Sequence, residues 1–300
     1  DCISLKNLDI TSFDTSQVTD MSRMFETASS LTFLDLNHFD TSKVQNMSHM
    51  FYYSSSLNNL KIDKFNTQEV KDMSYMFTLI RAISSISVEN FDTRNVENMA
   101  GMFQYCPQLK SLNLKNFVTS KVKNMSELFA DSSSLANLDI SGFDTRNVKD
   151  MSKMFLDCMA LSSLDISHFR TENLEDTSQM FSSCSGIRYL DVTGFSTEKV
   201  FNTSKMFQFM VALSSLDVSG FKTPEVKDMS GMFELCSNLK RLDVDGFDTS
   251  KVTNMKGFAQ DCSSLTSLKV SGFNTKNVKN MAKMFSGLTK VSVLDVSNFD

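Results

Sequence analysis

Apolar residues return along this chain at fixed positions of a 26-residue repeat. Counting positions from residue 1 and restarting after every 26, phenylalanine occupies position 13 each time, from Phe13 and Phe39 to Phe299. Position 25 is Phe in ten of eleven copies, and positions 5, 8 and 10 are always Leu, Ile or Val. A period of roughly 20 to 50 residues is typical of a solenoid, whose repeats bury their apolar faces against their neighbours. The pattern predicts a single solenoid domain over residues 1–300, with about eleven repeats.

Two shorter periods lie inside each repeat. Residues 137–141 alternate polar and apolar side chains, which is typical of a short strand with one buried face. Positions 18, 21, 24 and 25 then step by three and four, as in Val148, Met151, Met154 and Phe155, which indicates one stripe of a helix. A helix between strands makes successive strands parallel. Since strands stack at about 4.8 Å and helices need roughly 10 Å, we predict a curved α/β solenoid. Its parallel sheet lies on the concave side, its short helices on the convex side.

Two polar columns precede the predicted helix. Position 15 is threonine in all eleven repeats that contain it, and position 20 is always Asp or Asn. Either residue type can cap the free amides at a helix start, and the sequence leaves open which one does. A third interpretation makes the threonine column a regular surface for ice or carbohydrate, although capping explains it more economically.

The run LANLDISGFDTRNVKDMSKMFLDC, from Leu135 to Cys158, resembles the repeat of the BspA-like leucine-rich-repeat surface proteins. The similarity extends over the entire chain. It implies a leucine-rich-repeat solenoid in a secreted or cell-surface protein that serves adhesion or host contact and is not an enzyme. Departures are mild: Thr177 and Thr203 replace methionine at position 21, and residues 257–259 read Gly-Phe-Ala. We expect looser packing in those repeats.

Charge and motifs exclude several function classes. The net charge of −5 is mixed within every repeat and forms no basic stripe, which argues against nucleic acid as a partner. No apolar run reaches about 18 residues and no export leader opens the chain, so we expect no direct membrane insertion by this segment. We find no phosphate loop, HExxH or GxSxG, and therefore predict no enzyme and no cofactor. Because the chain starts and stops inside the repeat pattern, we expect a fragment without capping repeats.

All six cysteines fall at position 2, a column that elsewhere accepts Ala, Ser, Ile, Met and Leu. Such a column indicates a small buried slot, which favours free thiols over disulfides. Only the pairs Cys158 with Cys184 and Cys236 with Cys262 fall on adjacent repeats, and bridging stays open for these two. The histidines are far apart in the sequence, so we predict no metal site.

Position 9, on the outward side of the predicted strands, is our first candidate site. It is Asp in eight of twelve repeats, and five of these repeats are consecutive. A row of carboxylates is unfavourable without a counter-charge, so we hypothesise a ligand-binding surface for a basic partner or for weak Ca²⁺ binding. The alternative is that each Asp accepts hydrogen bonds from Ser at positions 7 and 11 and belongs to the scaffold. The candidate residues are the position 9 carboxylates and two position 7 neighbours: Asp139, Asp165, Asp191, Asp217, Asp243, Tyr189 and Arg241.

Aromatic and apolar departures on the predicted helical side are a second candidate. Exposed aromatic groups with a polar rim indicate protein contact, although isolated surface aromatics are ordinary. The candidate contact residues are Tyr52, Tyr53, Tyr75, Leu79, Tyr105, Phe201, Phe209 and Leu235.

These features favour a non-catalytic, extracellular or cell-surface module that presents its repeats to a protein or other cell-surface ligand. One alternative is a purely structural spacer or stalk. A weaker alternative is an acidic ladder that binds divalent cations.

Overall fold

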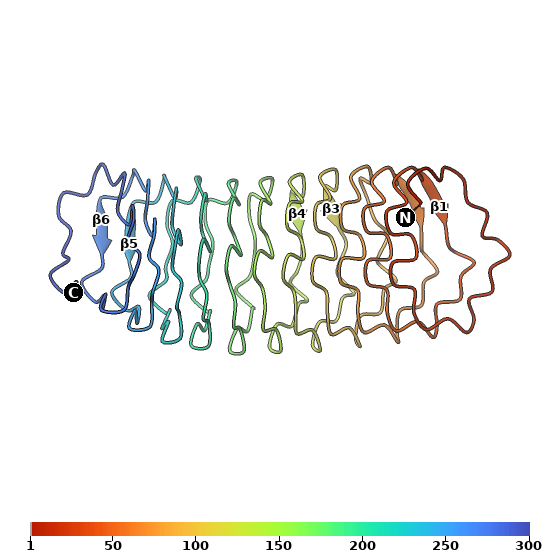
Figure 1. The fold of residues 1–300 in the computed structure, drawn as a ribbon, viewed down its shortest axis with the longest axis horizontal. Helices are drawn as coiled ribbons and strands as arrows, with labels where there is room; N and C mark the ends of the chain where they lie inside the picture. Colours follow the sequence, from red (N-terminus) through yellow and green to blue (C-terminus); the bar gives the residue numbers. More distant parts are fainter. Residues whose placement is uncertain (1) are drawn as a thin grey trace. The chain divides into compact units, whose positions relative to one another are not determined.

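The computed structural model describes residues 2–300 and divides the chain into two compact units, residues 1–145 and 146–300. Each unit is a stack of 26-residue loops, which we call rungs, with successive rungs side by side (Figure 1). Within each unit, equivalent residues of neighbouring rungs pair at an offset of 26. The predicted repeat architecture is therefore confirmed at the level of the rung. That the whole chain forms one solenoid stays a prediction.

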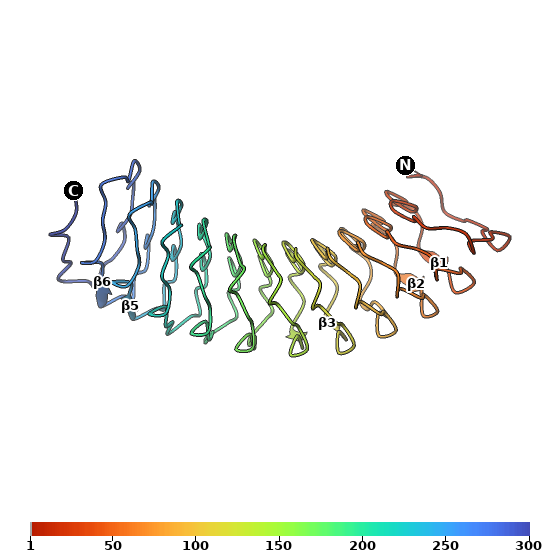
Figure 2. The same ribbon diagram turned by 90° about the horizontal axis from the view of Figure 1, so that it is seen from below.

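Short parallel strands occupy positions 7 to 9 of the rung, as the alternating pattern predicts. Unit 1 contains β1 (Phe33–Asp35), β2 (Asn59–Lys61), β3 (Ser111–Leu112) and β4 (Asn137–Leu138). Unit 2 contains β5 (Arg241–Asp243) and β6 (Ser267–Lys269). β1 pairs with β2, β3 with β4 and β5 with β6, always parallel and in register. Figure 2 shows the same rungs from below.

The prediction of short helices is wrong, because residues 2–300 contain none. In the segment from position 20 to 28, alternate backbone N–H groups donate to the next rung instead. The N–H of Met47, for example, donates to the carbonyl of Asp72 (2.9 Å), and that of Phe51 to Met76 (3.0 Å). The intervening N–H groups close tight turns three residues back, as from Met50 to Met47 (3.3 Å). This segment is therefore a second inter-rung ladder built from consecutive turns.

Backbone conformation explains why the helix does not form. Positions 23 and 27 adopt left-handed φ angles in every rung described, as at His49 (57°) and Tyr53 (58°). A right-handed helix requires φ near −63°, so two left-handed residues in each rung interrupt it. A helix about 10 Å wide would also separate rungs that the ladder holds roughly 4.8 Å apart. The three- and four-residue spacing correctly predicts which apolar residues are buried. Consecutive turns, and not a helix, produce this spacing.

The core consists of side-chain columns that run from rung to rung. The position 25 phenylalanines stack with ring centroids 5.6 Å apart for Phe77 and Phe103 and 6.0 Å for Phe103 and Phe129. In the Gly-Phe-Ala rung, Phe258 is fully buried and meets Phe233 (5.3 Å) and Phe273 (5.6 Å) edge-on. It thus bridges the two phenylalanine columns of unit 2. The expected loosening of this rung is not seen.

Thr177 and Thr203 are likewise fully buried. The hydroxyl of Thr177 donates to the carbonyl of Asn202 (3.2 Å), and that of Thr203 to Asp228 (3.3 Å). Each threonine therefore replaces methionine packing with a hydrogen bond to the next rung. Looser packing is not seen at these positions either.

The threonine column at position 15 joins adjacent rungs and caps no helix. Thr67 is fully buried, and its hydroxyl donates to the carbonyl of Asp92 (3.0 Å) while accepting from the N–H of the same residue (2.7 Å). The geometry repeats at Thr93 with Val118 and at Thr119 with Asp144. A column this deeply buried is not a surface for ice or carbohydrate.

Position 20 supports the turn ladder. Its side-chain oxygen accepts the N–H two residues later, as from Ser22 to Asp20 (2.8 Å) and from Ser48 to Asn46 (3.0 Å). This Asx turn satisfies the one N–H of the segment that neither ladder nor turn uses. Asn46 also donates to the second carboxylate oxygen of Asp20 (3.4 Å). The shared role at every rung explains why only Asp and Asn occur here.

The cysteines are free thiols, so the two pairs that the sequence left open are not bridged. Cys2 is exposed, contrary to the buried-slot prediction for that column, whereas the other five are buried. Each buried thiol for which a bond is resolved donates to the position 25 carbonyl of the preceding rung, as Cys106 does to Phe77 (3.3 Å). Ser54 donates to Phe25 in the same way (2.8 Å). The slot therefore accepts a thiol or hydroxyl donor as well as the apolar residues Ala28, Ile80 and Met210, which are buried in the same column. Burial raises the pKa of Cys106 and Cys262 to about 12.

Candidate functional site

The strand face, which we define as the side chains at positions 7, 9 and 11, presents the predicted acidic residues in both units. In unit 2, Asp165, Asp217 and Asp243 are exposed and Asp191 is half-buried. Tyr189 is 66% exposed and forms a parallel bridge with Ser215, and Arg241 projects from β5. Unit 2 thus brings these six candidates onto one face. Asp139, in unit 1, is exposed beside β4.

Local hydrogen bonds hold these carboxylates in fixed orientations. Oδ1 of Asp191 accepts both the N–H (3.0 Å) and the hydroxyl (2.7 Å) of Thr193, and Asp165 and Asp139 do the same with the serine at position 11. The donors at position 11 are thus as predicted, whereas within the described residues no position 7 hydroxyl donates to Asp165, Asp191 or Asp217. These bonds confirm that Oδ1 of the position 9 aspartates takes part in the scaffold. Ligand binding by these carboxylates stays a prediction.

The strand-face carboxylates of unit 2 stay ionised despite their mutual repulsion. Hydrogen bonds from the Thr193 hydroxyl and N–H lower the pKa of Asp191, outweighing the repulsion from Asp217 and Asp165. Similar bonds lower the pKa of Asp165 and Asp217. Asp243 differs, since Lys269 of β6 pairs with it. Over the described chain, Asp165, Asp191 and Asp217 have no cationic partner within ion-pair distance. They form an uncompensated acidic strip.

The turn face, which we define as the outward side chains of positions 22 to 29, carries a tyrosine and arginine cluster in unit 1. The guanidinium of Arg81 lies 5.6 Å from the ring centroid of Tyr53 and 5.1 Å from that of Tyr105. Both rings are exposed, by 37% and 39%. Leu79 occupies the same column between them and is half-buried. We call Tyr53, Leu79, Arg81 and Tyr105 the Tyr–Arg cluster.

The remaining predicted tyrosines lie next to this cluster on the same face. Tyr52 and Tyr75 are half-buried, and His49 packs against both, with ring centroids 5.4 Å and 5.0 Å away. A Cβ built at Gly101 would fall 2.3 Å from the Tyr75 ring, so this ring lies directly over the glycine backbone. The structure therefore brings the four predicted tyrosines and Leu79 together on adjacent rungs.

In unit 2, Phe201 and Phe209 do not lie on a helical side as predicted, because residues 146–300 contain no helix. They stand at positions 19 and 27, on either side of the turn segment, and are 43% and 41% exposed. Phe209 and Leu235 occupy the same column on successive rungs, joined by the bond from the Phe209 N–H to the carbonyl of Glu234 (2.8 Å). Phe201 is thus separated from the other two candidates.

Sequence reasoning missed Arg81, the residue that organises the Tyr–Arg cluster. Its column, position 3, otherwise holds only uncharged residues, so one charged departure was a usable signal. Phe33 was also missed; it is 49% exposed at position 7 of β1, with the Lys61 ammonium 5.6 Å from its ring. Such residues can be found in the sequence only when each outward position is compared across all repeats and the residues that differ in type are noted.

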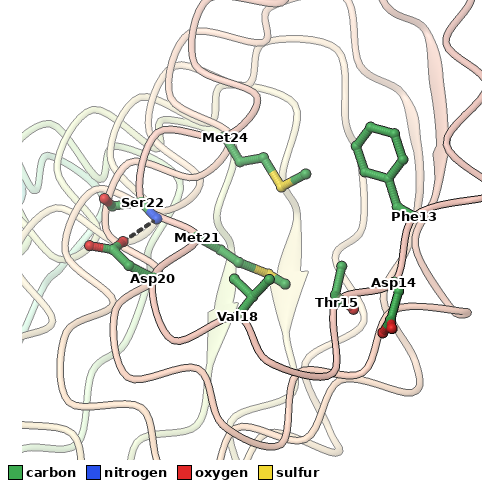
Figure 3. A pocket seen from close by; sticks show the side chains of 8 residues that line it. All are labelled: Phe13, Asp14, Thr15, Val18, Asp20, Met21, Ser22 and Met24. Atoms are coloured by element: carbon green, nitrogen blue, oxygen red, sulfur yellow. Dashed lines mark hydrogen bonds between the residues drawn. The ribbon is translucent and has the colours of Figure 1, made fainter.

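A hollow of about 580 Å³ at the first rungs of unit 1 offers no comparable chemistry. Figure 3 shows Phe13, Val18, Met21 and Met24 around it, with Asp20 turned away toward the N–H of Ser22. The lining consists of the outer faces of column residues, and its threonine and aspartates are engaged in local hydrogen bonds. These groups have no arrangement that suits acid–base or nucleophilic chemistry.

Residues 2–300 contain neither a metal-binding cluster nor a membrane-spanning helix. No three His, Cys, Asp or Glu side chains in that range gather closely enough to hold a metal ion. None of the described residues forms a helix with the length and hydropathy required to cross a membrane.

Three solved structures are similar to the chain at low identity. A leucine-rich repeat protein from Bacteroides ovatus is 16% identical over 91% of this chain and 80% of its own, with a TM-score of 0.39. A leucine rich cell surface protein from Faecalibacterium prausnitzii is 12% identical over 94% and 77%, at 0.41. The T. pallidum leucine-rich repeat protein is 17% identical over 68% and 74%, at 0.35. Scores this low carry no functional inference.

No curated protein matches the chain. One family profile matches nearly all of it in three overlapping segments, residues 2–86, 79–190 and 178–299. The chain therefore belongs to the family described as Mycoplasma protein of unknown function, DUF285.

Proposed function

We propose that this protein is a non-catalytic interaction module whose main contact surface is the Tyr–Arg cluster of unit 1. The observation that carries the proposal is the position of Arg81 between the rings of Tyr53 and Tyr105. Tyrosine and arginine are enriched among the residues that dominate protein interfaces. Because both rings contact the guanidinium, little side-chain entropy is lost when a partner binds.

Charge identifies the kind of partner that suits this surface. Arg81 is exposed and has no carboxylate within ion-pair distance in the described chain. A guanidinium donates two parallel hydrogen bonds to a carboxylate, and its ring contacts leave the N–H edges available for that purpose. The tyrosine edges and Leu79 supply apolar area beside the charge. We infer an acidic segment of a partner protein that also carries an apolar or aromatic side chain.

The acidic strip of unit 2 supports a second contact, with a basic partner. Each of Asp165, Asp191 and Asp217 has one oxygen fixed by a local hydrogen bond, which leaves the second for a ligand. Their pKa values are lowered, so the strip stays charged at neutral pH. The electrostatic contribution of these carboxylates to the binding of a basic partner is therefore fully present at neutral pH. It is lost only as the pH falls through the lowered pKa values.

A surface location and a role in adhesion are part of this proposal. They are supported by the likeness of the repeat to BspA-like surface proteins. The spacer alternative requires that no outward position matter for binding. Substitutions at Arg81 and at the acidic strip distinguish the two.

Arg81→Gln is expected to weaken binding of a Glu- and Phe-containing model peptide about tenfold, because a charge-assisted bidentate contact is lost. Arg94→Gln is the matched control, since Arg94 is an exposed arginine of unit 1 that already pairs with Asp92 (2.9 Å). Fluorescence anisotropy of the labelled peptide at two salt concentrations measures both. Equal losses in the two variants would show general electrostatic attraction and remove the Tyr–Arg cluster as a site.

The same assay with a Lys-rich peptide tests the acidic strip. The triple change of Asp165, Asp191 and Asp217 to Asn removes charge at constant size, and we expect weaker binding with less salt dependence. Unchanged binding of both peptides by every variant would favour the spacer alternative.

A further inference from the structure

The turn face of unit 2 contains a polar trough that none of the features described so far explains. Position 23, which carries a side chain in most rungs, here reads Lys205, Gly231, Gly257 and Lys283 on four successive rungs. The ladder joins these rungs directly, with N–H to carbonyl distances of 2.8 Å from Lys205 to Ser230, from Gly231 to Lys256 and from Gly257 to Ala282. The two glycines therefore form the floor of a hollow with a lysine at each end.

The hollow is large enough for a ligand. Its volume is about 500 Å³, within the range of small-molecule sites. All ten lining residues are polar, charged or glycine. Gly231 and Gly257 are buried, and both have left-handed φ angles, 60° and 62°. Other residues adopt such angles at this position elsewhere, so the backbone alone does not require glycine. What the glycines provide is space.

The side walls have fixed hydrogen-bonding groups. Gln208 is 9% exposed, and its amide accepts from the hydroxyl of Ser182 (3.4 Å) and donates to the carboxylate of Glu234 (2.6 Å). A Cβ added at Gly231 would meet Glu234 at 3.0 Å, so this carboxylate overhangs the floor. Gln260 overhangs Gly257 similarly, at 3.3 Å. Amides and a carboxylate in these positions suit a ligand rich in hydroxyl groups.

The trough carries a net positive charge, with three lysines and one glutamate in its lining. Lys205, Lys256 and Lys283 are exposed, and within the described residues none of the three ammonium groups lies within ion-pair distance of a carboxylate. Glu234 is the single acidic residue of the lining. With a ladder spacing of about 4.8 Å, the backbones of Lys205 and Lys283 lie roughly 14 Å apart across three rung steps. The arrangement suits an elongated anion that lies along the stack.

We propose that this trough binds an acidic oligosaccharide. Hydroxyl groups would meet Gln208, Glu234 and Gln260, while sulfate or carboxylate groups would pair with the lysines at the two ends. An acidic peptide that also carries apolar side chains is less suitable, because the lining contains no apolar side chain for them to pack against. The site lies in a different unit from the Tyr–Arg cluster and takes a different class of ligand, so it stands independently of that surface.

Direct binding by calorimetry tests the proposal with defined probes. A heparin-derived sulfated hexasaccharide and a hyaluronan-derived uronate hexasaccharide represent the two anionic groups, and maltohexaose is the neutral control. We expect at least one anionic sugar to bind and maltohexaose not to bind. Preference between the two anions identifies sulfate or carboxylate as the recognised group. Binding of neither anion, or equal binding of maltohexaose, overturns the proposal.

Two variants locate the binding. The double change Lys205→Gln and Lys283→Gln is expected to weaken binding about tenfold or more, since two charge-assisted contacts are lost. The control Lys222→Gln with Lys276→Gln removes the same charge outside the trough in unit 2, and we expect a change below about twofold. Equal losses would mean general attraction to a basic surface and would overturn the site.

Gly257→Asn fills the trough without changing its charge, and asparagine tolerates the left-handed φ that this position requires. We expect it to weaken sugar binding while the thermal unfolding midpoint stays close to that of the wild type. Unchanged binding by a folded Gly257→Asn variant contradicts the site. If the Gly257→Asn variant fails to fold, the comparison of the Lys205 and Lys283 double variant with the Lys222 and Lys276 double variant tests the site. A hexapeptide of Asp and Glu that binds as tightly as the sugars would overturn the ligand class.

Discussion

Thr93→Val is expected to destabilise unit 1 by about 1–3 kcal/mol, although it exchanges one small side chain for another of nearly equal size. The Thr93 hydroxyl is fully buried, donates to the carbonyl of Val118 (3.0 Å) and accepts from its N–H (2.7 Å). Valine fills the same volume but leaves both backbone groups without a partner. A buried polar group left unpaired costs about 1–3 kcal/mol. We do not double this cost for the two groups of Val118, because this residue is 45% exposed and both bonds are only partly buried.

Thr93→Ser is the control, because serine keeps the hydroxyl and loses only a methyl group, at a cost of about 1 kcal/mol. Urea unfolding of the two variants gives the free energies of unfolding. If valine proved as stable as serine, the hydroxyl would not join the rungs, and the explanation of this threonine column would be wrong.

Phe91→Ala should cost about 3–5 kcal/mol, the range for a buried aromatic truncated to alanine. Phe91 is 2% exposed and stacks on Phe65 with ring centroids 6.5 Å apart. Phe13 belongs to the same column and stacks on Phe39 at the same distance, but it is 49% exposed. About half of its area is already in water, so Phe13→Ala should cost clearly less.

The comparison uses one column, one substitution and one unit, so burial by neighbouring rungs is the variable. Denaturant midpoints and slopes for both variants measure it. Equal destabilisation at the two positions would mean that the column is not buried between rungs.

Much of the rung could be predicted because its columns repeat. The alternation at residues 137–141 predicts the strand that β4 confirms at Asn137–Leu138, and the 26-residue interval predicts the parallel register. Burial was also readable, since Val148, Met151, Met154 and Phe155 are all fully buried. Repetition supplied what a single copy could not: eleven independent samples of what each position accepts.

The helix could not be rejected from the sequence. Consecutive turns and a helix both return the backbone to the same side after three or four residues, so their apolar stripes look alike. The residues with left-handed φ gave little warning, because most of them, such as His49, Tyr53 and Lys153, are not the glycine or asparagine that usually mark it. Glycine stands at position 23 only in Gly101, Gly231 and Gly257. Inter-rung bonds stabilise these conformations, and bonds between residues 25 or 26 apart do not appear in a local pattern.

The candidate sites were predictable to a similar extent. Tyrosine positions and the aspartate column follow from counting, and the structure places Tyr53 and Tyr105 two rungs apart on one face. Arg81 and the lysines of the trough were missed because long side chains reach across rungs. Their importance depends on which neighbours are absent: a carboxylate beside Arg81, and side chains at Gly231 and Gly257.

Within residues 2–300, each unit contains two inter-rung ladders and no helices, so that the turn face of each unit is a hydrogen-bonded surface with fixed outward positions. Far-UV circular dichroism of the purified chain tests it most directly. We predict a spectrum without the paired minima of α-helix, and one that collapses cooperatively on unfolding. A spectrum with helical minima of the strength expected from a short helix in every repeat would contradict the account.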